Sequence, residues 1–259
     1  MIASYDMMDD FLTTCSDNSD VPSAPIPPRS KFKELMKRPI KDTLWSMRNK
    51  FKYPLNWRAH SSNEQCLVVD LEPNSTDYCQ VELKFRESLP DFPILSIKRV
   101  QNCWLWVRYA QAKTQLQSKG AVNEMELFHG SRTTPSDNIC SSEEGFDMRF
   151  SRQGLWGQAN YFAVKAYYSH HYAYLLNRKT CTKEIILAKV LTGDSIECDP
   201  DSTLRFPPEK QNRRNIRLKQ VRYDSVNGMT QGYKIYMTYA NDRAYPAYVI
   251  TYKDTNQDN

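Results

Sequence analysis

The stretch Met125-Glu126-Leu127-Phe128-His129-Gly130-Ser131 decides the fold of this chain, because it predicts a strand that carries a histidine into a glycine-containing loop. Two further segments follow it, Gly157-Gln158-Ala159-Asn160-Tyr161-Phe162-Ala163 and Tyr168-Ser169-His170-His171-Tyr172. Together the three segments supply an imidazole, loop backbone amides, a hydroxyl group and at least two aromatic faces. We therefore expect them to form a pocket for a flat ring that bears an amide and is joined to a sugar.

The chain before this stretch is expected to contain two helices. In residues 76–89 apolar side chains recur at three-to-four-residue spacing and stop at Pro90, which favours an amphipathic helix. Residues 103–116 show a similar pattern and are followed by Gly120, a common residue at helix ends. Residues 94–97, between the two helices, predict a short strand.

The chain after this stretch is expected to be mainly strands. Residues 164–176 are aromatic and apolar without glycine or proline, which favours a helix, whereas residues 185–191 predict a buried strand. Residues 233–239 and 245–252 predict two more strands, with Asn241-Asp242-Arg243 as a hairpin turn between them. Early helices and late strands, without a repeated strand–helix–strand order, indicate an α+β fold built on antiparallel sheet. The chain also lacks Gly-x-Gly-x-x-Gly after a strand, so a Rossmann domain is not expected.

Composition indicates one main domain preceded by a tail. The 259-residue chain is 40% hydrophobic and 12% aromatic, which is enough to form one core. Residues 1–30 are acidic and then proline-rich, so we expect a flexible tail. Residues 31–74 carry aromatic anchors without a clear period, and we expect a connector that packs on the main domain of residues 75–259.

The sequence predicts neither a membrane segment nor a metal site. No run approaches about eighteen consecutive apolar residues, and the first residues lack the basic-then-apolar order of a signal peptide. The seven cysteines are scattered, without Cys-x-x-Cys or the spacing of a zinc site. We therefore expect reduced thiols, no bound metal, no membrane association and an intracellular protein of the nucleus or cytoplasm.

The net charge of +5 is concentrated in two basic clusters. Residues 29–58 hold ten Lys or Arg and two acids, and residues 205–222 hold seven Lys or Arg and one acid. Either cluster could contact the phosphates of a dinucleotide or of nucleic acid. Solvated surface segments are the more common explanation of such clusters, and aromatic signatures of RNA recognition are missing from the sequence, so the support for nucleic acid is weak.

A series of ordered motifs runs from residue 53 to residue 254. Besides the three segments above it includes Tyr53-Pro54-Leu55-Asn56-Trp57, Arg99-Val100-Gln101-Asn102, Gly145-Phe146-Asp147, Ala188-Lys189-Val190-Leu191-Thr192-Gly193 and Tyr223-Asp224-Ser225. The series resembles the catalytic domain of the poly(ADP-ribose) polymerase family, the diphtheria-toxin-like ADP-ribosyltransferases, and is most similar to members that transfer a single ADP-ribose. The resemblance implies an ADP-ribosyltransferase fold of two packed, mainly antiparallel sheets with flanking helices, and it implies NAD as the co-substrate.

The resemblance also implies roles for residues of the three segments. His129 would hydrogen-bond the nicotinamide ribose, while the Gly130 backbone and the Ser169 hydroxyl would hold the carboxamide. Tyr172 would stack on the pyridine ring, and Tyr161 would close the opposite side. The implied NAD-binding residues are His129, Gly130, Ser131, Tyr161, Ser169 and Tyr172.

The implied catalytic triad is His129, Tyr161 and Ile235. Polymerising members of the family have glutamate at the third position. An aliphatic side chain cannot accept a hydrogen bond from a ribose hydroxyl or polarise an incoming sugar hydroxyl, so chain elongation is not expected. The resemblance thus implies an NAD-dependent protein mono-ADP-ribosyltransferase, whose acceptor proteins can include the enzyme itself. The alternative is a catalytically inactive module of the same fold that binds RNA or a protein partner, although the presence of both His129 and Tyr161 argues against it.

Two positions depart from the pattern of the family. Ala159 stands where a glycine is common, and a positive φ there would strain the loop by about 1 kcal/mol. Ala247 replaces a common glutamate in the last strand, and an error in register would make that position, instead of 235, the third of the triad. The loop of residues 194–211 is expected to cover the donor site, with Arg205 and Lys210 either near the pyrophosphate or free on the surface.

Overall fold

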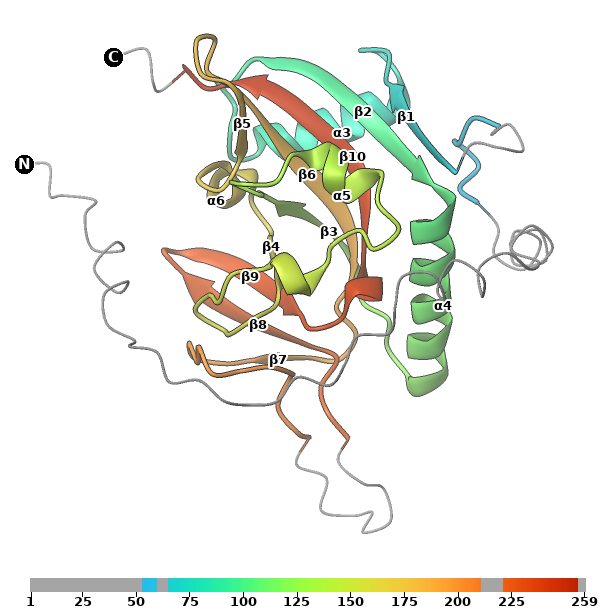
Figure 1. The fold of residues 1–259 in the computed structure, drawn as a ribbon, viewed down its shortest axis with the longest axis vertical. Helices are drawn as coiled ribbons and strands as arrows, with labels where there is room; N and C mark the ends of the chain where they lie inside the picture. Colours follow the sequence, from blue (N-terminus) through green and yellow to red (C-terminus); the bar gives the residue numbers. More distant parts are fainter. Residues whose placement is uncertain (1–52, 60–64, 211–220, 256–259) are drawn as a thin grey trace, which may run out of the picture. The chain divides into compact units, whose positions relative to one another are not determined.

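The computed structural model describes residues 53–59, 65–210 and 221–255. The tail expected at residues 1–30 and most of the connector lie outside these residues, so the domain division at residue 75 stays a prediction. The described strands form one ten-stranded sheet in the order β1-β2-β10-β6-β3-β4-β9-β8-β7, with β5 paired to β6 (Figure 1). The strands are β1 (Cys66–Asp70), β2 (Ile94–Asn102), β3 (Glu124–His129), β4 (Asn160–Ala163), β5 (Tyr174–Asn177), β6 (Thr182–Leu191), β7 (Ser195–Glu197), β8 (Ser225–Thr230), β9 (Tyr233–Thr238) and β10 (Ala244–Lys253). The helices are α3 (Thr76–Arg86), α4 (Cys103–Lys119), α5 (Ser136–Cys140) and α6 (Ala166–His170), with 3-10 turns η1 (Met148–Phe150) and η2 (Asn241–Arg243).

The sheet divides into two halves at a narrow seam. The first half contains β1, β2, β10, β6, β5 and β3, and the second contains β4, β9, β8 and β7, which lie together at one end in Figure 1. β3 pairs with β6 along its whole length, but β3 and β4 share a single Cα partner pair, Phe128 with Ala163. The α+β class with mainly antiparallel pairing is confirmed, since β7 and β8 form the one parallel pair among the described strands. The two expected sheets are instead two halves of one sheet, because the β3–β4 pair joins them.

Both early helices form where the periodicity of the sequence predicts them. α3 begins after Ser75, whose Oγ accepts a hydrogen bond from Tyr78 N at 3.3 Å. α4 begins after Asn102, whose Oδ1 accepts a hydrogen bond from Leu105 N at 3.1 Å, and it ends at Gly120 with a φ of 137°. Each helix packs its apolar face into a buried cluster that also contains strands of the first half of the sheet.

Two predictions about the later elements are wrong. Residues 164–176 do not form one helix, because α6 ends at His170 and the following β5 pairs with β6. β9 and β10 do not form a hairpin either, since β6, β3 and β4 lie between them in the sheet. The η2 turn instead carries the chain from the second half of the sheet back to the first.

Two parts of the expected connector are described, residues 53–59 and residues 65–74, which contain β1, and the first of them contacts β2 and α4. The backbone N of Arg58 donates to Gln101 Oε1 at 3.1 Å, and Gln101 Nε2 donates to the carbonyl O of Arg58 at 3.0 Å. The ring of Trp57 lies 5.6 Å from that of Trp106 and 6.1 Å from that of Tyr245. The reciprocal amide bonds and the aromatic contacts together fix this segment to the first half of the sheet.

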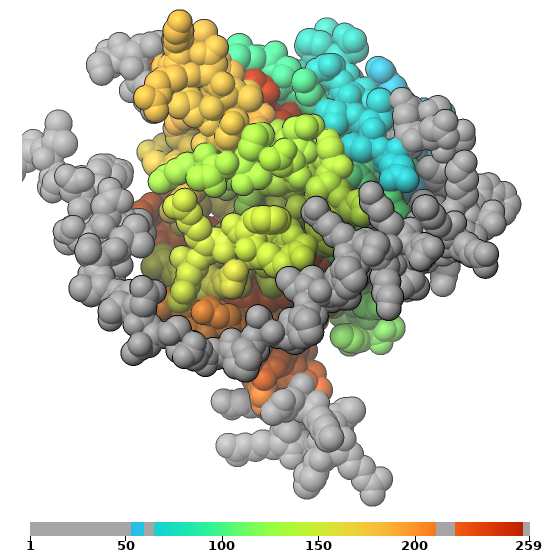
Figure 2. All heavy atoms as spheres, viewed as in Figure 1, coloured from blue at the N-terminus to red at the C-terminus, as the bar shows by residue number. Residues whose placement is uncertain are grey.

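The chain between β3 and β4, which contains α5 and η1, lies over the front of the sheet and appears in yellow-green in Figure 2. Its buried residues Ile139, Cys140 and Phe146 pack with Leu127 of β3 and Phe162 of β4. This segment therefore covers the seam on one side with apolar side chains.

Candidate active site

His129 is the last residue of β3 and lies at the seam between the two halves of the sheet. Its Nδ1 is 2.8 Å from the carbonyl O of Tyr161 on β4. A carbonyl oxygen can only accept a hydrogen bond, so Nδ1 carries the proton and Nε2 presents a lone pair. The centroid of the imidazole lies 5.0 Å from the ring of Phe146 and 5.5 Å from the ring of Phe162. The hydrogen bond and the two rings fix the orientation of the imidazole.

The environment of His129 also fixes its charge. Burial lowers the pKa of His129 below its ordinary value of 6.5, and the hydrogen bond to the Tyr161 carbonyl opposes this shift only in part. The imidazole is therefore neutral near pH 7. A neutral ring whose Nδ1 is engaged offers Nε2 as an acceptor for a hydroxyl group such as that of a sugar.

Gly130 lies against the turn that follows α6. A Cβ at Gly130 would be 2.3 Å from the carbonyl O of Ser169 and 2.6 Å from the carbonyl carbon of Tyr172, so any larger residue would force the two segments apart. Tyr172 N donates to Ser169 O at 3.0 Å and closes this turn. Ser131 continues the loop, and its carbonyl O accepts a hydrogen bond from Thr134 N at 3.3 Å. The structure thus brings Gly130, Ser131, Ser169 and Tyr172 close together.

Tyr161 and Ile235 lie on one face of the second half of the sheet. Tyr161 is opposite Met237 and Ala163 is opposite Ile235 in the β4–β9 pair, so these four side chains share a face. Ile235 is 1% exposed and belongs to a buried cluster with Trp156, against which Tyr161 packs. The third triad position is therefore apolar and closely packed.

The turn before β4 covers the ring of Tyr161. The Tyr161 hydroxyl accepts a hydrogen bond from Trp156 N at 3.0 Å and donates to the carbonyl O of Gly157 at 2.7 Å. A Cβ at Gly154 would lie 2.7 Å from the same hydroxyl oxygen. Burial raises the pKa of Tyr161 to about 12, so this hydroxyl stays protonated near pH 7. Tyr161 therefore organises the turn with its hydroxyl as well as presenting an aromatic face.

The two departures from the family pattern have different outcomes. Positive φ values among the described non-glycine residues occur at Asn123, Cys181 and Gln231, so Ala159 is not strained in the expected way. Ala247 lies on β10 in the first half of the sheet, where it packs with α4 and not with Tyr161. Tyr161 therefore shares its face of the sheet with Ile235 of β9 and not with Ala247 of β10.

The loop after β7 borders the turn before β4. A Cβ at Gly157 would lie 1.8 Å from the carbonyl O of Leu204, so the two segments are in close backbone contact. Lys210 Nζ lies 2.6 Å from Asp194 Oδ2, and Arg205 Nη1 donates to the carbonyl O of Leu204 at 3.2 Å. The loop is therefore placed beside the Tyr161 turn, whereas contact of Arg205 or Lys210 with a pyrophosphate stays a prediction.

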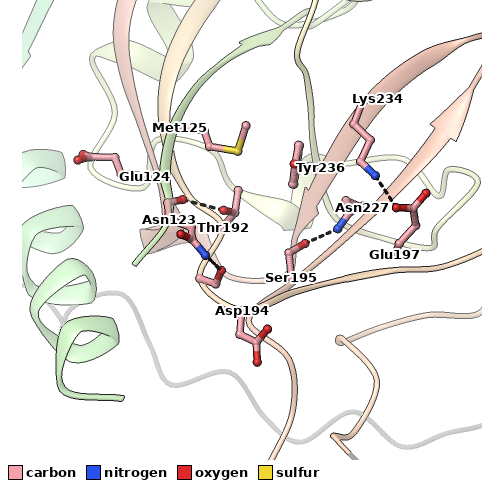
Figure 3. A pocket seen from close by; sticks show the side chains of 11 residues that line it. Asn123, Glu124, Met125, Thr192, Asp194, Ser195, Glu197, Asn227, Lys234 and Tyr236 are labelled. Atoms are coloured by element: carbon pink, nitrogen blue, oxygen red, sulfur yellow. Dashed lines mark hydrogen bonds and ion pairs between the residues drawn. The ribbon is translucent and has the colours of Figure 1, made fainter. Parts of the chain in front are cut away.

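A separate cavity of about 520 Å³ lies on the opposite face of the second half of the sheet. Lys234 and Tyr236 line it, and their side chains point away from the face of Ile235 because side chains alternate along β9. Figure 3 shows that several of its polar groups are paired with one another. Lys234 Nζ lies 2.7 Å from Glu197 Oε2, and Asn227 Nδ2 donates to Ser195 Oγ at 2.8 Å. This cavity is not part of the site predicted from the sequence.

Sequence reasoning missed two residues that border the site. The guanidinium carbon of Arg132 lies 5.3 Å from the centroid of the Tyr172 ring. The ring of Tyr168 lies 5.4 Å from that of Tyr172 and packs on the cluster that contains Ile235. Tyr168 stands next to Ser169 in a recognised segment, which could have suggested its place. No pattern in the sequence signals that Arg132 would fold back over an aromatic ring.

The described residues contain neither a candidate membrane-spanning helix nor a candidate metal-binding cluster. The helices among them are all too short or too polar to cross a membrane. Their His, Cys, Asp and Glu side chains form no group of three or more that could hold a metal ion.

Comparison with known proteins gives matches over most of the chain. The family described as Poly(ADP-ribose) polymerase catalytic domain matches residues 75–254. A probable poly [ADP-ribose] polymerase of Dictyostelium discoideum is 29% identical over 209 residues, or 78% of this chain and 57% of that protein. Protein mono-ADP-ribosyltransferase PARP12 of Homo sapiens is 32% identical over 194 residues, or 73% of this chain and 26% of that protein. Protein mono-ADP-ribosyltransferase PARP11 of Mus musculus is 29% identical over 221 residues, or 77% of this chain and 64% of that protein.

The chain spans only part of the length of these relatives, about half of the Dictyostelium protein and a quarter of human PARP12. The part that it shares contains α3 and every later element, including the seam with His129, the Gly130 contact and the Tyr161–Ile235 face. Because the family match covers more than half of the residues and includes all the elements that build this site, the chain belongs to the poly(ADP-ribose) polymerase catalytic domain family.

Proposed function

We propose that this chain transfers one ADP-ribose unit from NAD to a side chain of an acceptor protein and releases nicotinamide. The observation that carries the proposal is the pairing of a neutral, oriented His129 with the apolar face of Tyr161 and Ile235. The first group can bind a ribose, and the second lacks the carboxylate that would assist a further sugar hydroxyl. Three relatives also favour transfer of a single unit, because each is named a protein mono-ADP-ribosyltransferase. They are human PARP12, human PARP14 and mouse PARP11.

Gly130 supports NAD as the donor. Its missing side chain lets the β3 loop meet the turn of residues 169–172, which places a backbone amide and carbonyl beside an aromatic ring. A carboxamide needs one donor and one acceptor, and a pyridine ring needs a flat apolar surface. In the proposed complex Gly130 and Ser169 hold the carboxamide, Ser131 continues the wall, and Tyr172 stacks on the ring.

In the proposed reaction the bond between ribose C1′ and the nicotinamide nitrogen breaks. Its electron pair goes to the ring, which leaves as neutral nicotinamide, and positive charge builds on the ribose. His129 Nε2 accepts a hydrogen bond from a ribose hydroxyl and holds the sugar in position. A nucleophilic side chain of the acceptor then attacks C1′. The protein itself is included among the acceptors, and the reaction takes place inside the cell, consistent with the free thiols of the six described cysteines.

Incubation of the purified chain with NAD and a panel of proteins, followed by mass spectrometry of the intact proteins, tests this function. We expect additions of single ADP-ribose units. His129→Ala removes the acceptor that positions the ribose and should lower the rate about 100-fold. Thr114→Ala, an exposed substitution on α4 that is remote from the seam, is the control and should leave the rate unchanged.

Other outcomes of this assay separate the alternatives. Ladders of repeated units would contradict the inference drawn from Ile235. The absence of any addition, together with tight binding of RNA or of a protein, would favour a catalytically inactive module. Equal rates for wild type and His129→Ala would remove the histidine from the mechanism.

A further inference from the structure

Arg132 lies over one face of the Tyr172 ring. Its guanidinium carbon is 5.3 Å from the ring centroid, within the range of a cation–π contact. Its Nη2 donates a hydrogen bond to the carbonyl O of His171 at 2.8 Å. The hydrogen bond and the ring contact hold the charge beside the turn that packs on Gly130. Since Arg132 occupies one face of Tyr172, a flat ligand that stacks on this ring would have to use the other face.

We propose that Arg132 is a specificity-determining residue, which makes the Tyr172 pocket favour neutral nicotinamide over a cationic pyridinium ring. This inference rests on the proposed function, in which Tyr172 stacks on the nicotinamide of NAD. The nicotinamide ring of NAD carries a positive charge, whereas free nicotinamide is neutral. A fixed guanidinium on the far side of Tyr172 therefore distinguishes the bound donor from the departing product.

The size of the effect follows from the distance between the charges. A ring stacked on the free face of Tyr172 would lie roughly 9 Å from the guanidinium, if aromatic stacking has its usual separation. Arg132 is exposed, so water screens much of the repulsion. At an effective dielectric constant between those of the protein surface and of water, the repulsion weakens binding of the cation about threefold.

The repulsion between Arg132 and the ring decreases as the reaction proceeds. When the C1′–nitrogen bond breaks, the bonding electron pair neutralises the ring, and the positive charge moves off the ring that stacks on Tyr172 and onto the ribose, which His129 holds in the proposed complex. The guanidinium thus destabilises the bound donor more than the transition state in which nicotinamide departs. This difference in free energy promotes cleavage of the bond. Arg132 touches neither reacting atom and acts through its charge and through the position of Tyr172.

Binding of two small ligands tests this proposal. Nicotinamide and 1-methylnicotinamide share the same ring and carboxamide, but only the second carries the pyridinium charge. The quantity to measure by calorimetry is the ratio of their dissociation constants, for the wild-type chain, Arg132→Gln, Arg132→Lys and Arg178→Gln. Arg178→Gln is the matched control, because Arg178 is exposed in the turn between β5 and β6 and its substitution changes the net charge equally. Thermal unfolding of each variant establishes that it is folded.

We expect Arg132→Gln to lower the ratio of 1-methylnicotinamide to nicotinamide dissociation constants about threefold. Arg132→Lys keeps the charge and should retain the wild-type ratio, and so should Arg178→Gln. In the wild type, added salt should lower the ratio as the charge is screened. An unchanged ratio in Arg132→Gln, or an equal change in Arg178→Gln, overturns the proposal while leaving the proposed function intact. If the wild type binds neither compound, the pocket itself is wrong, and both proposals fall.

Discussion

In the proposed mechanism Ile235 limits the reaction by its packing as well as by its chemistry. It lies on the same face as Tyr161 and contacts the buried cluster of Trp156, Ala163 and Met237. A carboxylate in this place would have to give up its hydration among apolar neighbours. The apolar third position is therefore part of the core of the second half of the sheet, and a single substitution should not convert it into a polymerising site.

Ile235→Glu is expected to destabilise the protein by about 3 kcal/mol, because the carboxyl would be buried among the apolar side chains of Trp156, Ala163 and Met237. Ile235→Val is the matched control and should cost about 1 kcal/mol, the price of one lost methylene. Urea unfolding followed by tryptophan fluorescence measures both. Equal destabilisation by the two substitutions would show that water reaches position 235.

At the same scale, the sequence predicted some residues of the candidate site and not others that border it. His129, Tyr161 and Tyr172 lie in short segments whose residue types and order carry the resemblance to the family. Arg132 lies three residues after His129, but its contact with Tyr172 depends on how two loops meet. Local sequence does not encode such a contact, so it became visible only in three dimensions.

At the scale of elements, predictions succeeded where the deciding interactions are local. α3 and α4 have caps and apolar periodicity within their own sequences, and both form as expected. The hairpin predicted from β9 and β10 does not form, because these strands pair with partners that are distant in sequence. Residues 174–176 are aromatic and apolar, a composition that suits a helix or a strand, and they form a strand because they pair with β6.

The turn before β4 gives a prediction for one glycine. Gly157 has a φ of +74°, and a Cβ there would also meet the carbonyl O of Leu204 at 1.8 Å. We expect Gly157→Ala to destabilise the protein by about 3 kcal/mol, since strain adds to the displacement of the loop after β7. It should also weaken nicotinamide binding, because the turn covers Tyr161.

Gly232→Ala provides the matched control for this turn. Gly232 has a φ of +79° but open space around its missing Cβ, so only the backbone strain of about 1 kcal/mol is expected. Thermal unfolding and calorimetric titration with nicotinamide measure the two effects. If both alanine variants behave alike, the contact between Gly157 and Leu204 does not hold the loop in solution.

At the scale of the whole molecule, a buried ionic group ties α6 to the end of β10. Lys183 Nζ lies 2.6 Å from Asp254 Oδ2, and His170 Nδ1 is 2.9 Å from the hydroxyl of Tyr252. Burial, reinforced by the charge of Lys183, lowers the pKa of His170 to about 4. His170 is therefore neutral in the folded state at pH values where the unfolded chain already binds a proton.

This network predicts acid sensitivity of the fold. Because the folded pKa of His170 is below the unfolded value of 6.5, its contribution to stability is present above pH 6.5 and is lost as the pH falls toward 4. The loss should reach up to about 3 kcal/mol. Urea unfolding at a series of pH values should show a shallower decline in His170→Gln than in wild type. His171→Gln, at an exposed histidine, should keep the wild-type slope, and a wild-type slope in His170→Gln would assign the effect to other groups.

The position of β10 has a consequence for how the chain reaches this structure. β10 lies between β2 and β6, which are made far earlier during synthesis, and it pairs with β6 from Ala244 to Lys253 and with β2 over residues 248–252. While the ribosome is still adding the residues before Ala244, β2 and β6 have exposed edges and no partner on that side. The first half of the sheet can close only after translation has passed Lys253, so nascent chains halted before that point should depend on chaperones to escape aggregation.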